Sequence, residues 1–88
     1  MVTFDEPKRK SNLVKHGIDL AACTDIFDKP MVTIEDSREA YGEQRLCSLA
    51  WISTGVVVLM VWVDREFTHI ISCRKATKDE TRHYFKSI

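Results

Sequence analysis

The stretch VVVLMVWV, from Val56 to Val63, decides the fold that this sequence predicts. It is too short to cross a membrane and is rich in β-branched residues, so it predicts a buried strand. Because successive positions are all apolar, both faces of this strand must be covered, as they are in the middle of a sheet. We therefore arrange the other elements around this central strand.

Strands are expected on both sides of it. Arg45 to Ser53 alternates weakly between polar and apolar residues and leads into a turn at Thr54-Gly55. Phe67 to Arg74 follows a second turn and alternates more clearly. One face of this last strand should carry Phe67, His69, Ile71 and Cys73, and the other Thr68, Ile70, Ser72 and Arg74. We assign His69 to the core because its face is otherwise apolar.

The segment before Arg45 predicts two short strands and two helices. The strands are Val2–Phe4 and Met31–Glu35, and the polar tract 36–43 that follows predicts a loop. The first helix begins after the N-cap Asp5 and ends at Gly17. The second begins after the N-cap Asp19 and ends at Pro30, and its apolar positions follow a helical period: Leu20, Cys23, Ile26 and Phe27.

A last helix follows Thr77, which forms a capping box with Glu80. We summarise the order as β-α-α-β-β-β-α. The predicted fold is a single α+β domain over residues 1–88, an antiparallel sheet with an N-terminal helical hairpin and a C-terminal helix.

Composition excludes several classes of protein. A chain of 88 residues, 44% hydrophobic and 30% charged, has the size and make-up of one globular domain. It has no apolar run of about 18 residues and no secretory signal pattern, so we expect a cytoplasmic protein without membrane contact. The three cysteines, Cys23, Cys47 and Cys73, lack metal-ligand spacing and predict small buried thiols, with no metal and no cofactor.

The net charge is zero, but the charges are segregated along the chain. Acidic residues fill the middle, and basic residues gather near the two ends: Lys8, Arg9, Lys10 and Lys15, then Arg74, Lys75, Lys78, Arg82 and Lys86. If both ends meet on one face, they create a local positive field. The alternative is two solvated helix faces.

The junction between the last strand and the last helix carries the strongest chemical signal. Arg74 ends the strand, and Lys75 lies just before the capped helix, where free backbone N–H groups also favour an anion such as phosphate. Alternatively, Arg74 is a surface residue paired with Asp79 or Glu80. Candidates for proton transfer lie in the same basic clusters: His16, His83 and Tyr84.

Each of these candidates also has a structural interpretation. His16 would complement the dipole at a helix C-terminus, and Tyr84 would pack its ring on the sheet. If the chain cuts nucleic acid, these residues point to attack by a ribose 2′-hydroxyl on the adjacent phosphate without a metal ion. That chemistry restricts the substrate to RNA.

Three segments resemble the BrnT family of bacterial toxins: FDEPKRKSNLVKHGIDLAAC, IFDKP and ISCRKATKDETRHYF. GEQR and the strand leading to DRE fall in the right order between them. The chain departs from the family at LAWIS, where Trp51 stands in a strand that often carries glycine. Trp51 and Trp62 would stack on RNA bases or belong to the core or to a partner interface.

The resemblance implies a RelE-like fold and a type II toxin that inhibits translation by cutting RNA without a metal. It implies a BrnA-type antitoxin with a ribbon-helix-helix domain, a complex of two toxins and two antitoxins, and repression of the operon mainly through DNA contacts of the antitoxin. It places Arg74 and Arg65 on the active surface, with Lys15, His16 and Arg45 as further candidates.

We therefore expect catalysis from Arg74, Arg65, Lys15, His16 and Tyr84. RNA binding is expected from a second set: Lys8, Arg45, Lys75, Arg82 and His83. The alternative is a non-catalytic module that binds nucleic acid or a regulatory partner, whose binding would weaken steeply with salt and cause no cleavage.

Overall fold

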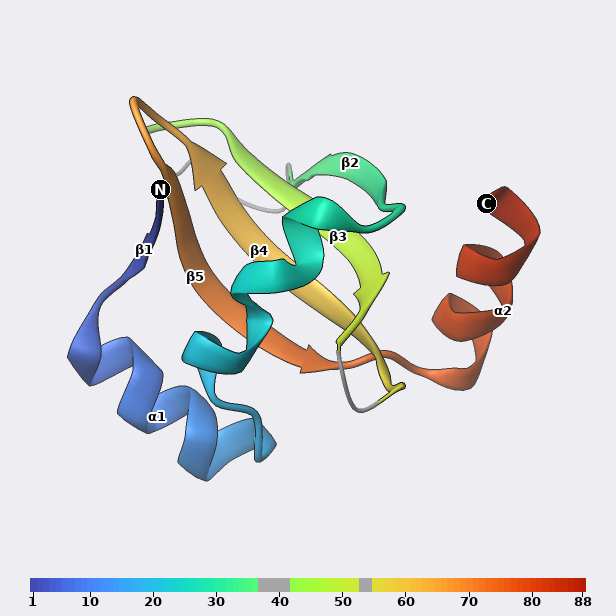
Figure 1. Cartoon of the computed structure of the whole chain (residues 1–88), viewed down its shortest axis with the longest axis horizontal. Coiled ribbons are helices and arrows are strands. Elements are labelled where there is room, and N and C mark those ends of the chain that lie inside the picture. The colour runs from blue at the N-terminus through green and yellow to red at the C-terminus, as the bar shows by residue number, and fades with distance from the viewer. Residues whose placement is uncertain (37–41, 53–54) are drawn as a thin grey trace.

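The computed structural model describes residues 1–36, 42–52 and 55–88 and is shown in Figure 1. Its sheet has the order β1-β5-β4-β3-β2, and β4 (Val57–Asp64) is the central strand, as predicted. The other strands are β1 (Val2–Phe4), β2 (Val32–Asp36), β3 (Arg45–Trp51) and β5 (Thr68–Lys75). The helices are α1 (Glu6–His16), the 3₁₀-helix η1 (Leu20–Asp28) and α2 (Lys78–Ser87).

The α+β class is confirmed, but two parts of the predicted architecture are wrong. The predicted order β-α-α-β-β-β-α contains one strand too few, because four strands lie between η1 and α2. The sheet is also mixed, since β1 pairs with β5 in parallel. No hairpin turn joins these two strands, which lie at opposite ends of the chain, so nothing forces them to be antiparallel. Parts of the predicted loop 36–43, Ser53 and the turn at Thr54 lie outside the described residues.

The second predicted helix is a 3₁₀-helix. Leu20, Cys23 and Ile26 are fully buried and recur every three residues, which matches the three residues per turn of this tighter helix. The Asp19 side chain caps it by accepting a hydrogen bond from the Ala21 N–H. Arg9 of α1 donates two hydrogen bonds to the same carboxylate, at 2.8 and 3.0 Å, and so ties the two helices together.

A β-bulge in β5 changes which residues face the core. Val61 lies opposite Ser72, whereas Trp62 lies opposite Ile70, so Ile71 is the extra residue. Ile70 and Cys73 consequently belong to the same buried cluster. The predicted alternation placed them on opposite faces and is wrong beyond this bulge.

The two faces of the sheet are covered unequally. Figure 1 shows η1 across the front of the sheet and α1 beside the edge at β5, while α2 lies beyond the end of β5. The main core lies under η1 and includes Met60, Val58 and Trp62, whose indole N–H donates to Ser48 Oγ at 2.8 Å. On the other face, Tyr84 of α2 packs with Leu49, Val57 and Ala76. All three cysteines are buried, as predicted.

The predicted helix ends are confirmed. Gly17 closes α1 in the left-handed conformation at φ 70°, and Thr77 and Glu80 form the capping box of α2. His69 is buried and hydrogen-bonded to Thr3 at 2.7 Å, in agreement with its assignment to the core. Within the described residues, no helix has the length and apolar character needed to span a membrane.

Candidate functional site

The two cations at the end of β5 lie on opposite sides of the sheet. Side chains alternate along a strand, so Arg74 and Lys75 point in opposite directions. Arg74 lines a groove between β2 and α2, whereas Lys75 lines two other cavities, one beside the end of α1 and one at the start of α2. The corner that the sequence suggested as one site is therefore divided in two.

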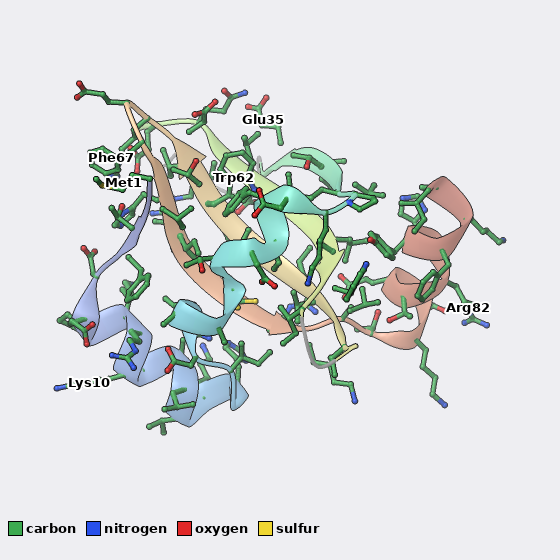
Figure 2. The ribbon with its side chains drawn as sticks, in the orientation of Figure 1. Met1, Lys10, Glu35, Trp62, Phe67 and Arg82 are labelled. Carbon is green, nitrogen blue, oxygen red and sulfur yellow. The ribbon has the colours of Figure 1, made fainter. Side chains whose placement is uncertain are left out.

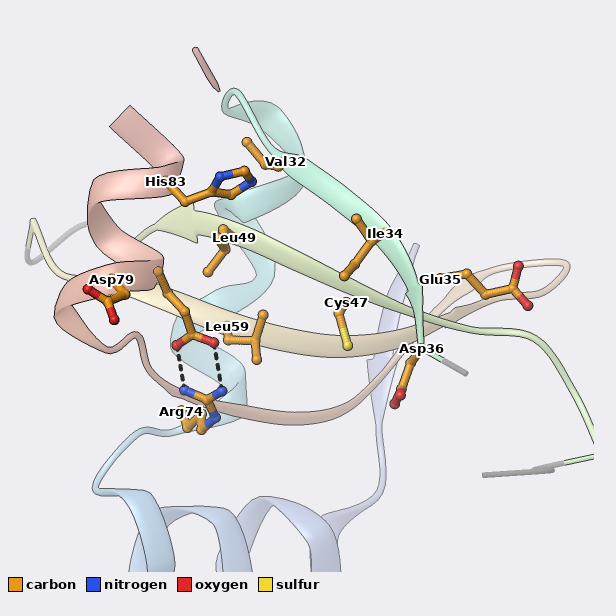
Figure 3. A pocket seen from close by; sticks show the side chains of 11 residues that line it. Val32, Ile34, Glu35, Asp36, Cys47, Leu49, Leu59, Arg74, Asp79 and His83 are labelled. Atoms are coloured by element: carbon orange, nitrogen blue, oxygen red, sulfur yellow. Dashed lines mark hydrogen bonds and ion pairs between the residues drawn. The ribbon is translucent and has the colours of Figure 1, made fainter. Parts of the chain in front are cut away.

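The Arg74 groove has a volume of about 600 Å³ and is seen from close by in Figure 3. Its floor is apolar and is formed by Val32, Ile34, Cys47, Leu49 and Leu59. Its polar lining carries four carboxylates against one guanidinium and one imidazole: Glu35, Asp36, Asp79, Glu80, Arg74 and His83. The groove is therefore acidic, and a phosphate meets repulsion there unless a carboxylate moves away.

Glu80 forms an ion pair with Arg74 in this groove. Two parallel hydrogen bonds of 2.8 and 2.9 Å join the guanidinium nitrogens to the two carboxylate oxygens. These bonds lower the pKa of Glu80 from 4.5 to about 2, so its carboxylate stays ionised at neutral pH. Of the two partners that the sequence offered for Arg74, the structure shows Glu80.

Lys75 lies beside His16, which comes from the other end of the chain. The two residues line a cavity of about 370 Å³ together with Gly17 and Asp19. A neighbouring cavity of about 330 Å³ brings Lys75 together with Lys78 and Arg82. Lys75 has no ion-pair partner within residues 1–36, 42–52 and 55–88. This surface brings a second predicted proton-transfer residue, His16, together with predicted phosphate-binding residues, as the Arg74 groove does with His83.

The two other candidates on α2 have different surroundings. His83 is exposed and lines the Arg74 groove. Tyr84 is fully buried, and its hydroxyl donates to the Pro30 carbonyl at 2.8 Å. Burial raises the pKa of Tyr84, which makes proton release harder. Its environment fits the packing role that the sequence left open.

Arg65 and Arg45 lie at the opposite end of the sheet from Arg74. Arg65 lies in the turn before β5, and at about 3.3 Å per strand residue it is roughly 25–30 Å from Arg74. Arg65 pairs with Glu43 at 3.0 Å, and Arg45 begins β3 opposite Asp36. The structure therefore does not bring Arg65 or Arg45 to the phosphate that Arg74 would hold.

The two basic ends of the chain do not form one continuous surface. In Figure 2, Lys10 on α1 and Arg82 on α2 project from different ends of the molecule. Lys8 and Lys15 are exposed on α1, and only His16, at the end of that helix, lines a cavity with Lys75. The predicted common face is thus limited to the end of α1 and the start of α2.

The two tryptophans lie outside these cavities. Trp62 is a core residue, whereas Trp51 is 37% exposed and carries the Lys29 ammonium 3.9 Å from its ring centre. Among the described residues, no group of three His, Cys, Asp or Glu side chains is arranged to hold a metal ion.

The groove between β2 and α2 is not predictable from the sequence. Its only sequence signal is the alternation of Val32, Ile34 and Asp36 along a short strand, which gives no indication that the strand edge faces a helix. The sequence predicts Glu80 as a capping residue and offers it as a partner of Arg74. Only the structure shows that one carboxylate binds Arg74 and the Thr77 N–H at the same time.

Comparison with known proteins gives a family match and a similar solved structure. A family model described as the ribonuclease toxin BrnT of type II toxin-antitoxin systems matches residues 4–80. The 1.1 Å crystal structure of the Brucella abortus ribonuclease toxin BrnT is 25% identical, with a TM-score of 0.67, over 88% of this chain and 96% of that one. No curated protein matches the chain. The family match covers most of the chain, which therefore belongs to the BrnT ribonuclease toxins of type II toxin-antitoxin systems.

Proposed function

We propose that this chain is an endoribonuclease that cleaves RNA in the cytoplasm without a metal ion and thereby inhibits translation. The observation that carries the proposal is membership of a ribonuclease toxin family over residues 4–80. We further propose that the fold is of the RelE type. A BrnA-type antitoxin would neutralise the toxin in a complex of two toxins and two antitoxins, which represses its own operon mainly through the antitoxin.

The reaction that fits the available side chains is transfer of the phosphate to the neighbouring ribose. The 2′-hydroxyl loses its proton to a base and attacks phosphorus, the bond to the 5′-oxygen breaks, and an acid protonates the leaving oxygen. The products are a 2′,3′-cyclic phosphate and a 5′-hydroxyl end. RNA is the substrate because DNA lacks the attacking hydroxyl.

Arg74 is the residue that we assign to charge stabilisation on the reacting phosphate. It lies at the end of a strand, where the backbone holds it firmly, and its guanidinium is already in a bidentate arrangement with an anion. His83 lines the same groove and is the nearest candidate for proton transfer there. Lys75, Lys78 and Arg82 would hold the flanking phosphates on the adjoining surface.

The His16–Lys75 cavity is the alternative centre. An imidazole and an ammonium in one cavity suit acid–base work on a phosphodiester. Lys15 precedes His16 on an exposed helix end and would then assist binding.

The test uses purified protein without a partner, labelled single-stranded RNA and excess EDTA. Arg74→Ala and Lys75→Ala are assayed beside wild type after a folding check. We expect cleavage that leaves 2′,3′-cyclic phosphate ends and is lost in Arg74→Ala. Cleavage lost in Lys75→Ala and His16→Ala alone would move the centre to the alternative cavity. No cleavage of free RNA, or of messenger on ribosomes, would favour a non-catalytic binding module.

A further inference from the structure

The Glu80 carboxylate has two different partners. It accepts the two hydrogen bonds of 2.8 and 2.9 Å from Arg74, and its Oε1 atom also accepts one of 2.8 Å from the backbone N–H of Thr77. In Figure 3, two dashed lines join the Arg74 guanidinium to the two oxygens of this carboxylate. One side chain therefore caps a helix and neutralises the arginine at the end of β5.

The geometry of this pair resembles that of a phosphate complex. A guanidinium offers two parallel N–H donors, which match two oxygens of a carboxylate or two oxygens of a phosphodiester equally well. Both terminal nitrogens of Arg74 donate to Glu80. An RNA phosphate that uses this fork must therefore take the place of the Glu80 carboxylate.

Protonation does not remove Glu80 from this position at neutral pH, because the ion pair lowers the pKa of the carboxyl to about 2. Displacement by another anion is the remaining route. α2 can survive that displacement, because Thr77 Oγ1 still accepts from the Glu80 N–H at 3.2 Å and the Thr81 N–H still donates to the Thr77 carbonyl. The helix then loses one of its capping bonds rather than its first turn.

We propose that Glu80 is a built-in competitor for the anion site of Arg74. An RNA phosphate binds the Arg74 fork only after Glu80 has left it, and the same step removes the reciprocal half of the capping box of α2. The inference rests on the proposed function, since it takes the RNA backbone as the ligand of Arg74. Glu80 is accordingly a positioning residue that sets the affinity for substrate.

The first measurement is RNA affinity, by fluorescence anisotropy with a labelled 2′-O-methyl oligonucleotide that lacks the attacking hydroxyl. Glu80→Gln should bind at least about fivefold more tightly than wild type, because a charge-assisted competitor has been removed. The matched control is Glu66→Gln, which removes one negative charge from an exposed position in the turn before β5, far from Arg74. It should change affinity less than about twofold. Adding Arg74→Ala to Glu80→Gln should abolish the gain.

The second measurement follows α2 itself. Hydrogen exchange at the Thr77 amide should speed up when the oligonucleotide binds wild type, because that N–H loses its carboxylate partner. In cleavage assays, Glu80→Gln should lower KM and leave kcat unchanged, the pattern of altered binding alone. Should Glu80→Gln unfold, Glu80→Asp keeps the charge, shortens the reach to Arg74 and should also tighten binding.

Three results would overturn the proposal: equal affinities of Glu80→Gln and Glu66→Gln, an affinity gain that survives Arg74→Ala, or loss of kcat in a folded Glu80→Gln protein. The last would make Glu80 part of the chemistry. Failure of the ribonuclease proposal is separately visible, because the oligonucleotide cannot be cleaved. If Glu80→Gln binds RNA more tightly in a way that depends on Arg74, but no variant cleaves RNA, Glu80 is supported as a competitor and the ribonuclease proposal is contradicted.

Discussion

Asn12 joins α1 to β5 through its side-chain amide. It is buried, and its amide nitrogen donates to the carbonyls of Ile18 and Cys73, both at 2.8 Å. Its oxygen accepts from the Cys73 N–H at 3.1 Å. β1 pairs with β5 only as far as Ile70, so Asn12 takes over the outer edge of β5 where β1 ends.

Replacing Asn12 should therefore be costly. In Asn12→Ala, the N–H and the carbonyl of Cys73 lose their partner in a buried setting, and we expect about 2 kcal/mol lower free energy of unfolding. Urea denaturation measures it. Ser11→Ala, at the neighbouring exposed position, is the control and should stay within about 0.5 kcal/mol of wild type. Equal stability of the two variants would contradict the role given to Asn12.

Glu80 makes a second prediction at this scale, for acid stability. Its pKa is lowered in the folded protein from 4.5 to about 2, chiefly by the hydrogen bonds from Arg74. A carboxyl with a lowered pKa stabilises the fold above its unfolded value and ceases to do so as pH falls. Wild type should therefore lose more stability than Glu80→Gln between pH 4.5 and pH 2.

Urea midpoints measured across this pH range check the prediction. Asp79→Asn keeps Glu80 and should follow the wild-type decline. Parallel curves for wild type and Glu80→Gln would show that the Arg74–Glu80 pair contributes nothing to stability in solution.

At the scale of elements, the spacing of apolar residues decides the kind of helix. Leu20, Cys23 and Ile26 are spaced by three and are buried on one side of η1. In α1, by contrast, Asn12 is the buried residue, and Val14 is 89% exposed. The first helix is thus held by specific polar contacts and by its ends rather than by an apolar stripe.

The end of α1 supplies a prediction for an element. Gly17 has φ 70°, and a Cβ atom added there would meet nothing within 4 Å, so a substitution tests the backbone conformation alone. Gly17→Ala should cost about 1 kcal/mol, because a Cβ is unfavourable in the left-handed region. Gly17→Asn should cost less, since asparagine tolerates this region. Thermal unfolding ranks the two, and equal melting temperatures would contradict the argument.

At the scale of the whole molecule, the cavities lined by Lys75 and the ion pair of Arg65 lie at opposite ends of the sheet. The start of α2 and the end of α1 bring Lys75 to the cavities with His16 and Arg82. Arg65 lies at the other end and pairs with Glu43. A substrate that follows the cavities around Lys75 does not reach Arg65.

RNA binding should therefore depend on Lys75 and not on Arg65. Lys75→Ala should weaken binding of the 2′-O-methyl oligonucleotide and reduce the slope of log affinity against log salt by about 1. Arg65→Ala, which also removes one cation, is the matched control and should leave the slope unchanged. A slope that falls in Arg65→Ala but not in Lys75→Ala would show that RNA binds at the Arg65 end of the sheet.

Local patterns determined most of the architecture. The uninterrupted apolar run at Val56–Val63 required a central strand, and the glycine and the capping box fixed where α1 ends and α2 begins. These features depend on neighbours within a few residues, so the sequence by itself determined them. Local motifs also predicted membership of the BrnT family, and the family match over residues 4–80 confirms it.

Tertiary structure alone decided the site. The bulge at Ile71 reversed the faces of β5, and parallel pairing with β1 came from the other end of the chain. Packing of α2 against β3 left an acidic groove around Arg74, between α2 and β2. Contacts between residues distant in sequence depend on how elements pack, which no local pattern encodes. The Arg74–Glu80 ion pair is intermediate, because its residues are close in sequence and were offered as partners there, but only the structure shows which carboxylate Arg74 binds.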